Sequence, residues 1–302
     1  MAINTIEYAE RFTGELDKAY VQKAVTGFLA DNVLRAKFVG AKTVIVPDVD
    51  FVGLVDYDRD NGFTRSAVTV AHQPFTMAMD RGRSIEIDRE DLDETGISNL
   101  AGSIMGEYVR TKVVPETDAY ILSKLAGVAN EHSHTVAWNG TKPYSVFTEI
   151  VGEVQDKAGY DEELVCFVDK TAYAAIMNST ELSKSITVSE FKQGDVNLKV
   201  KSINGVAIIP VSSDRMKSAY VFSKSDDTNK AGGFTADGSA KDIHMLVLPK
   251  KAASLVKKTE KIRVFTPEQN LNADAYKFDY RIYYDVFVKK SAIDSIWASF
   301  GA

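Results

Sequence analysis

The feature that most constrains the fold of this chain is a long alternation of apolar and polar residues close to its C-terminal end. Apolar or aromatic side chains occupy every second position from Phe278 to Val288, and Asp and Arg fill most positions between them. A period of two is typical of a β-strand with one buried face. A dozen residues at ~3.3 Å each make a strand of roughly 40 Å, about twice the usual length. The pattern therefore predicts an extended subunit instead of a compact enzyme.

Short β-type runs separated by Pro, Gly and Asn-Gly fill residues 42–88. Such runs, bounded by turn residues, predict a long β-ribbon. We expect it to reverse in the polar stretch at residues 56–62, because Asn61-Gly62 readily adopts the positive φ angles of a tight turn. An isolated ribbon is only marginally stable in water, so the sequence predicts that this one lies on another surface.

The strongest helical periodicity covers residues 97–129, where apolar residues recur at intervals of three and four. Pro115 lacks a backbone N–H, so we expect it to bend or divide the helix. Asp93, Glu94 and Thr95 precede the segment. They favour a helix start there, because acidic and hydroxyl side chains accept hydrogen bonds from the free N–H groups of a first turn.

A thinner apolar stripe at helical spacing runs through residues 3–34 and includes Phe12, Leu16 and Tyr20. Glycines interrupt it. A stripe with so few apolar anchors needs a partner surface, which lies either in the same domain or on a neighbouring subunit.

The middle of the chain mixes helices and strands without the regular order of a doubly wound parallel sheet. Helices are predicted at residues 145–158 and 171–178, and strands at residues 164–169, 196–201, 206–211, 219–223 and 243–248. The predicted fold class is therefore α+β.

The charge and the cysteine content limit what the chain binds. A net charge of -6 repels nucleic acid, so any contact with DNA is expected to be weak and non-specific. Cys166 is the single cysteine and lies in an apolar run, which predicts a buried neutral thiol without catalytic or disulfide chemistry. No apolar run approaches the ~20 residues that a membrane-spanning helix needs, so we expect no membrane contact.

Four short patterns imitate functional motifs, and each lacks a partner that the chemistry requires. They are the calcium-loop-like Asp56-x-Asp58-x-Asp60, the pair His132-x-His134, the acyl-enzyme-like Ser189-x-x-Lys192 and the acidic residues 88–94. A calcium loop needs a bidentate Glu at its twelfth position, and two imidazoles leave a zinc ion short of its ~four ligands. The serine motif lacks its companions, and the acidic run suits helix capping. We therefore expect no catalytic residue, no cofactor and no metal.

A basic group follows late in the chain, at Lys250, Lys251, Lys257, Lys258, Lys261 and Arg263. Such a group is most often a solvated face, and it also suits a contact with the acidic run of a neighbouring copy.

The order of these segments carries a resemblance. After the arm and the ribbon come DRGRSIEID at residues 80–88, the acidic run, and MGEYVRTKVVPETDAY at residues 105–120. This series resembles the major capsid proteins of tailed phages with the HK97-type fold. The likeness is most specific from residue 79 to residue 125, and the order of elements extends it over nearly the whole chain.

The resemblance implies a division of the chain into five parts. These are an N-terminal arm (1–34), an extended E-loop hairpin that lies over an adjacent subunit (35–88), a P-domain with a long spine helix (89–144), a central A-domain (145–264) and returning P-domain strands (265–302).

The resemblance also implies a function. The chain would be the head protein that forms the hexamers and pentamers of an icosahedral or prolate virion shell around double-stranded DNA, assembled in the bacterial host cytoplasm. Its partners would be many copies of itself, a separate scaffold protein or a cleaved scaffold segment, a portal and decoration proteins. No lysine lies between Lys42 and Lys112. Covalent cross-linking through an E-loop lysine, which some relatives use, is therefore not expected.

Side chains on the arm and the ribbon are expected to form much of the contact between subunits. The candidate interface residues are Phe12, Leu16, Tyr20, Phe51, Asp56, Tyr57, Arg59, Phe63, Arg65, Arg81 and Arg83.

Two alternatives stay open at the sequence level. An encapsulin-type compartment uses the same fold to hold cargo enzyme instead of a genome. A soluble α+β hydrolase using Asp88, Glu90 or His132 belongs to a different functional class, and a monodisperse monomer would favour it.

Overall fold

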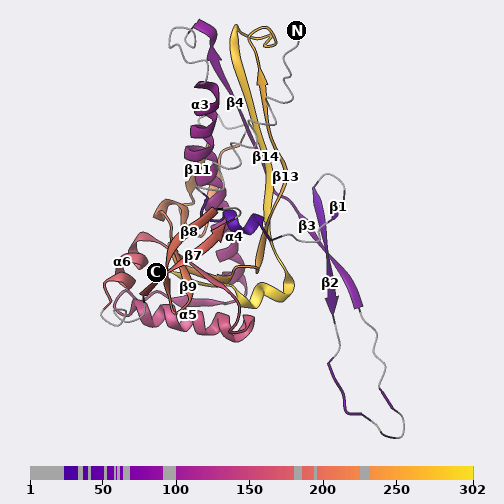
Figure 1. The fold of residues 1–302 in the computed structure, drawn as a ribbon, viewed down its shortest axis with the longest axis vertical. Coiled ribbons are helices and arrows are strands. Elements are labelled where there is room, and N and C mark those ends of the chain that lie inside the picture. The colour runs from indigo at the N-terminus through magenta and orange to yellow at the C-terminus, as the bar shows by residue number, and fades with distance from the viewer. Residues whose placement is uncertain are drawn as a thin grey trace.

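A computed structural model describes most of the chain. The described residues are 24–32, 37–39, 42–50, 53–57, 59, 62–63, 69–90, 100–179, 186–193, 196–224 and 232–301. Figure 1 shows three parts: a compact body, an upright sheet that rises from it, and a hairpin that projects to one side. The molecule is therefore extended, as the long alternation predicted.

The compact body is built on a mixed sheet with the order β5-β15-β12-β6-β9-β8-β7. Its strands are β5 (Thr135–Ala137), β6 (Leu164–Val168), β7 (Ile186–Gln193), β8 (Val196–Ile203), β9 (Val206–Pro210), β12 (Ile243–Pro249) and β15 (Trp297–Phe300). The predicted strands at residues 164–169, 196–201, 206–211 and 243–248 are confirmed, and no strand was predicted at the positions of β5 and β7.

Helices cover both faces of this sheet. Helices α5 (Pro143–Ala158) and α6 (Lys170–Met177) pack on one face, and α4 (Val114–Glu131) packs on the other. Alternate residues of β6 therefore enter two different cores, Cys166 with α5 and α6, and Phe167 with α4. A strand that is buried on both faces needs a continuous apolar run, which explains its sequence LVCFV.

The upright sheet contains β13 (Ala253–Phe265), β14 (Ala275–Val288) and β4 (Met79–Asp88), all antiparallel. The long strand predicted from the alternation is confirmed as β14, which has 14 residues. It pairs with β13 from Ala253↔Val288 to Phe265↔Lys277.

Two strands lie in other sheets than the order of elements suggested. Residues 253–264 were expected in the A-domain, yet they form most of β13 in the upright sheet. Residues 265–302 were expected to return to the P-domain, yet β15 joins the sheet of the compact body. Strand β4 pairs with β14, so residues 79–88 belong to the upright sheet and not to the projecting ribbon. The boundaries between domains stay a prediction.

The long helix is interrupted where Pro115 predicted it. Helix α3 (Leu100–Tyr108) continues through a π-helical segment, η2 (Val109–Val113), into α4, whose first turn contains Pro115. Proline offers no N–H to the carbonyl one turn earlier, and its ring crowds that turn. A widened π turn accommodates both effects. The candidate helix start at Asp93, Glu94 and Thr95 lies outside the described residues.

The projecting hairpin consists of β2 (Thr43–Asp50) and β3 (Thr69–Thr76), and β1 (Lys37–Val39) pairs with the outer edge of β2. The ladder runs from Thr43↔Thr76 to Asp50↔Thr69, which confirms the predicted ribbon in these strands. Gly62 has a φ of 78°, in keeping with a reversal near Asn61-Gly62.

Smaller elements complete the described chain. They are the 3-10 turns η1 (Gly27–Ala30), η4 (Ser213–Arg215) and η5 (Lys290–Ser295), and a separate ladder of β10 (Tyr220–Phe222) with β11 (Phe234–Ala236).

The turn between β8 and β9 offers a direct test of the backbone geometry. Asn204 and Gly205 both have positive φ angles, 51° and 81°. We expect Gly205→Ala to lower the free energy of unfolding by about 1 kcal/mol, because a Cβ is strained in that region. Gly152 lies inside α5 without a positive φ, and a methyl group added there would meet open space. Gly152→Ala should therefore raise the same free energy by roughly 0.4–1 kcal/mol in urea unfolding. If both variants changed the free energy of unfolding in the same direction, this explanation would be contradicted.

Candidate assembly interface

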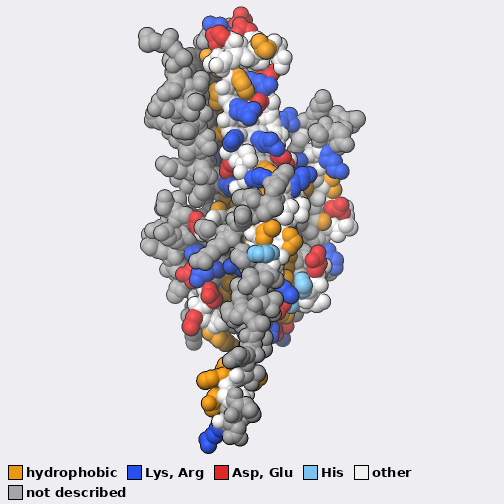
Figure 2. Space-filling model, turned by 90° about the vertical axis from the view of Figure 1, so that its right-hand side faces the viewer, with side chains coloured by type: hydrophobic (Ala, Val, Ile, Leu, Met, Phe, Trp, Pro, Cys, Tyr) orange, Lys and Arg blue, Asp and Glu red, His pale blue; other side chains and the backbone are white. Residues whose placement is uncertain are grey.

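The described part of the hairpin tip exposes apolar side chains. Leu54 is fully exposed, Phe63 is 86% exposed and Tyr57 is 59% exposed. The rings of Tyr57 and Phe63 lie 4.9 Å apart between centroids and contact each other. Figure 2 shows hydrophobic side chains gathered on this projection, at the lower end of the molecule. Exposed apolar clusters of this kind are typical of surfaces at which another protein binds.

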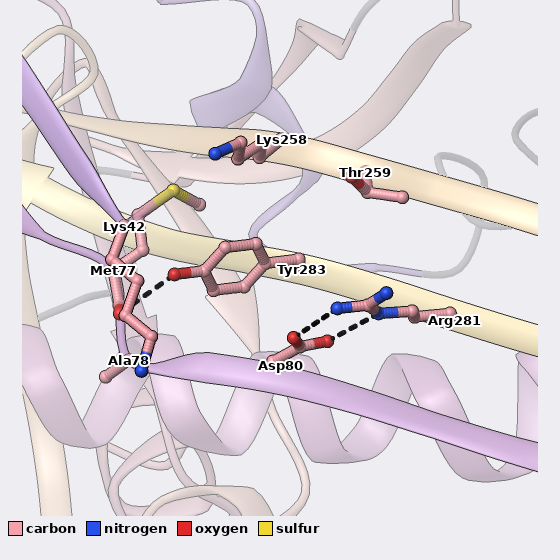
Figure 3. Close-up of a pocket in the computed structure, with 8 residues that line it drawn as sticks. All are labelled: Lys42, Met77, Ala78, Asp80, Lys258, Thr259, Arg281 and Tyr283. Atoms are coloured by element: carbon pink, nitrogen blue, oxygen red, sulfur yellow. Dashed lines mark hydrogen bonds and ion pairs between the residues drawn. The ribbon is translucent and has the colours of Figure 1, made fainter. Parts of the chain in front are cut away.

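The base of the hairpin, unlike the tip, is packed firmly on its own chain. Met77 is 2% exposed and joins Val44 and Val46 in a small core with Tyr283 and Phe287 of β14. The ring of Phe75 lies 4.8 Å from that of Phe287. Figure 3 shows the Tyr283 hydroxyl pointing to the backbone of Met77, where it donates a hydrogen bond of 3.2 Å to the carbonyl oxygen. In the described part of the hairpin, the packing on its own chain is therefore at the base.

A buried carboxylate connects the hairpin base to the long helix. The Asp285 side chain is completely buried on β14. Its Oδ1 accepts hydrogen bonds from Lys124 Nζ at 2.6 Å and Tyr120 Oη at 2.9 Å, both on α4. Its Oδ2 accepts one from the backbone N–H of Ala78 at 3.0 Å, directly after the hairpin. One side chain therefore fixes where the hairpin leaves the subunit.

A second buried carboxylate, Asp118 on α4, holds the segment at residues 24–30. It accepts hydrogen bonds from the N–H groups of Val25 and Thr26, from the Thr26 hydroxyl at 2.6 Å, and from Arg215 at 3.2 Å. Burial raises the pKa of the Asp118 carboxyl, and these donors oppose that rise.

The part of the predicted arm that the structure describes packs on its own chain. Phe28 and Leu29 are fully buried in the core under α4, and the Phe28 ring stacks on Phe167 at 6.1 Å. The arm was predicted to span residues 1–34. Because Phe28 and Leu29 are buried in the core, the described end of this segment anchors it to its own subunit. Phe12, Leu16 and Tyr20 lie outside the described residues.

The other candidate interface residues divide into three groups. Asp56, Tyr57, Arg59 and Phe63 are exposed near the hairpin tip, and Arg83 is exposed on β4. Phe51 and Arg65 lie outside the described residues. Arg81 differs from the expectation, because its guanidinium binds within its own chain to Glu116 at 2.6 Å and to the carbonyl of Ser223. The structure gives Arg81 a role in joining β4 to α4.

The motif-like patterns do not assemble into a reaction centre in the described part of the chain. No group of three or more His, Cys, Asp or Glu residues that could hold a metal ion occurs there. His132 ends α4, and the His134 ring stacks on Trp297 at 5.2 Å. Ser189 and Lys192 lie on β7, and Asp88 accepts a hydrogen bond from the backbone of Glu90. None of the helices in the described ranges combines the length and the apolarity needed to cross a membrane.

Cys166 is fully buried, and its burial raises the pKa of the thiol. We therefore expect Ellman's reagent to leave the folded protein unmodified and to react with one thiol per chain in denaturing urea, because the thiolate is the reactive form. The absorbance of the chromophore that the reagent releases, measured without urea and in denaturing urea, checks this. Rapid modification of the folded protein would contradict the burial of β6 between two helical layers.

Sequence comparison gives no relative, since no family model and no curated protein matches the chain. Comparison with solved structures does find similar proteins. The capsid structure of the cyanophage P-SCSP1u superposes with a TM-score of 0.58 at 15% identity, over 88% of this chain and 85% of that one. The mature capsid of bacteriophage PhiM1 gives 0.56 at 17% identity, over 87% and 82%. The virus-like particle from Pyrococcus furiosus gives 0.54 at 9% identity, over 97% and 100%.

The chain has the HK97-type capsid fold. The α+β class and the resemblance inferred from residues 79–125 are thereby confirmed.

Sequence reasoning missed the residues that fix the hairpin. Asp285 and Lys124 are far apart in the sequence and meet only in the folded chain. The one available signal was an aspartate inside the apolar run YYDVFV of β14, because a buried charge in such a run needs a partner.

Proposed function

We propose that this chain is the major capsid protein of a tailed bacterial virus, which forms the hexamers and pentamers of an icosahedral or prolate shell around double-stranded DNA. The observation that carries the proposal is the projecting hairpin, whose apolar tip has no covering surface within the described chain. The HK97-type fold supports it, because the structures that share this fold include phage capsids.

The mechanism is geometric and needs no catalysis, so we propose a structural protein and not an enzyme. A contact between two different surfaces of one chain repeats until the curvature of the array closes it. Each interface is expected to bury on the order of 1,000 Å² or more, and the many contacts of one subunit act together. The net charge of -6 keeps contacts with packaged DNA weak and non-specific.

The proposal includes further partners and a location. A separate scaffold protein or scaffold segment would set the curvature, and a portal and decoration proteins would complete the virion. Assembly would take place in the bacterial host cytoplasm.

A protein compartment that encloses cargo enzyme is the second candidate. It is favoured by the match to the Pyrococcus furiosus virus-like particle, which covers 97% of this chain. The two candidates share the shell and differ in what it contains.

Size-exclusion chromatography followed by negative-stain electron microscopy tests the proposal. We expect the purified protein, of 33.2 kDa per chain, to elute as capsomers or as large assemblies, and the large assemblies to image as closed shells. DNA-filled, tail-bearing particles from infected cells would exclude the cargo compartment. A monodisperse monomer at high concentration would contradict both shell functions.

A further inference from the structure

One face of the upright sheet is polar. Every second residue of β14 from Phe278 to Tyr284 enters the core, so the positions between them lie on the opposite face. Residues that are paired directly across an antiparallel ladder share a face. The ladders therefore place Lys261 and Arg263 of β13 on the polar face, together with Glu86 and Asp88 of β4.

The charges on this polar face are sorted by strand. The charged residues of β13 that are paired on it, Lys261 and Arg263, are cations, whereas those of β4, Asp80, Glu86 and Asp88, are anions. Strands β13 and β4 are the two edges of the sheet, with β14 between them. Figure 2 looks at the molecule from the β13 side and shows Lys and Arg side chains gathered along the upright part. One edge of the sheet is therefore basic and the other is acidic.

The middle strand neutralises only part of this charge. Arg281 of β14 donates two hydrogen bonds to Asp80, at 2.9 and 2.6 Å, as Figure 3 shows. Lys277 of β14 forms an ion pair of 3.9 Å with Asp279 of the same strand. Lys261 stands directly opposite Arg281 in the ladder, and like charges in that position are unfavourable. The strand next to Lys261 therefore offers it no compensating anion.

Four charged side chains at the two edges form no ion pair with the residues that the structure describes. Arg263 lies opposite Asp279 in the ladder, and the carboxylate of Asp279 already pairs with Lys277. The four side chains, all exposed, are Lys261 and Arg263 at the basic edge and Glu86 and Asp88 at the acidic edge. Because β14 separates the two edges within one chain, the complementary charges can meet only between copies.

The two edges match in spacing and in direction. Lys261 and Arg263 are two positions apart on β13, as Glu86 and Asp88 are on β4, so each pair is separated by roughly 6–7 Å along its strand. Both strands are antiparallel to β14 and therefore run in the same direction. A second copy in a similar orientation can place its two carboxylates beside the two cations at the same time.

We propose that the basic edge of β13 is a docking surface for the acidic edge of β4 in a second copy of the chain. Glu86 of the incoming copy pairs with Lys261, and its Asp88 pairs with Arg263. The acidic residues 90–94, which follow β4, extend the negative charge of the incoming edge. The inference rests on the proposed function and names a contact that is separate from the hairpin.

This contact joins two different surfaces of the chain, so it is head to tail and continues from copy to copy. Exposed ion pairs are individually weak, and their repetition in every copy multiplies their effect. Complementary charges at matching positions also fix how two copies are aligned.

Zero-length cross-linking of wild-type shells tests the contact without altering the protein. A water-soluble carbodiimide joins a carboxylate to a lysine amine as an amide, and it takes up the water that is lost to become its urea. Shells are assembled from equal amounts of unlabelled and isotope-labelled chains, so that a cross-linked peptide pair of mixed label reports a bond between copies. We expect mixed pairs that join residues 86–94 to Lys261.

Two substitutions of Lys261 separate its charge from its reactivity. Lys261→Arg keeps the charge but lacks the amine that forms the amide, so assembly should be unchanged and the cross-link lost. Lys261→Glu places a carboxylate opposite Glu86, and we expect it to lower the yield of shells by at least about fivefold. Adding Glu86→Lys should restore the yield, because opposite charges then face each other in exchanged positions.

Lys170→Glu is the matched control. It reverses the charge of an exposed lysine at the start of α6, on the compact body, and should leave the yield of shells unchanged. Circular dichroism of the free subunits should be the same for all variants, because the substituted side chains are exposed.

The outcomes separate this inference from the proposed function. Wild-type shells without mixed-label links to Lys261, or shells of normal yield from Lys261→Glu, overturn the inference while the shell function stands. Wild-type protein that forms no shell at all overturns both.

Discussion

Deleting residues 56–65 is expected to lower the yield of assembled shells by about tenfold or more, while the subunit keeps its fold. The deletion removes Tyr57 and Phe63, which contact each other and are largely exposed within the chain. Burying such a side chain at an interface contributes ~1.5–3 kcal/mol, and 1.4 kcal/mol is a factor of about ten in affinity. Quantitative sedimentation of assembled against free protein measures the effect.

Circular dichroism and the melting temperature of the free subunit show whether the deletion spares the fold. They should change little, because losing exposed tip side chains costs the isolated chain almost nothing. Tyr160→Ser is the matched control: Tyr160 is 76% exposed on the body, in the turn after α5, and its loss should leave assembly unchanged. Shells of normal yield from the deletion variant would remove the hairpin from the interface.

The elements that the sequence predicted well are those with a strong local signal. Strand β14 alternates most clearly from Phe278 to Ile282, where one face covers the core and the other is exposed or half-buried, whereas both faces are buried from Ile282 to Phe287. The division of the long helix follows from Pro115 alone, since a missing donor and a ring clash act within one turn. Strand β6 was also predictable from its sequence, because burial on both faces leaves only apolar positions.

Strand β13 was missed for a physical reason. Its apolar residues occupy odd positions at Ala253 and Leu255 and even positions at Ile262 and Val264. The bulged residue Lys258 shifts the phase by one, so no single period of two describes the strand. The lysines around the bulge then suggest a solvated segment. A bulge becomes visible only when the partner strand is known.

The candidate interface shows the same division between local and distant information. The exposed tip could be predicted, because a polar turn with two aromatic residues is a property of a few neighbouring positions. The role of Arg81 could not, because its partners Glu116 and Ser223 come from α4 and the region after β10. The side chain of Asp285 likewise acquires its role only from Lys124, 161 positions away.

Replacing Asp285 with alanine is expected to lower the free energy of unfolding by roughly 3–5 kcal/mol. The substitution leaves the Lys124 ammonium and the Tyr120 hydroxyl without their acceptor in a largely buried site, and it frees the N–H of Ala78. An uncompensated charge and unpaired donors cost far more than the lost contacts themselves. Urea unfolding of the dissociated subunit measures the change.

The Asp80–Arg281 pair, on the surface of the same junction, is the matched control. Its side chains are 43% and 63% exposed, so Asp80→Ala should cost about 0–1 kcal/mol. A double-mutant cycle of Asp285→Ala with Lys124→Met then tests the cause of the large effect. Removing both charges should recover part of the loss, because no half-buried ammonium is then left without a partner. A loss below about 1 kcal/mol for Asp285→Ala, or full additivity in the cycle, would mean that other contacts hold the hairpin at its angle.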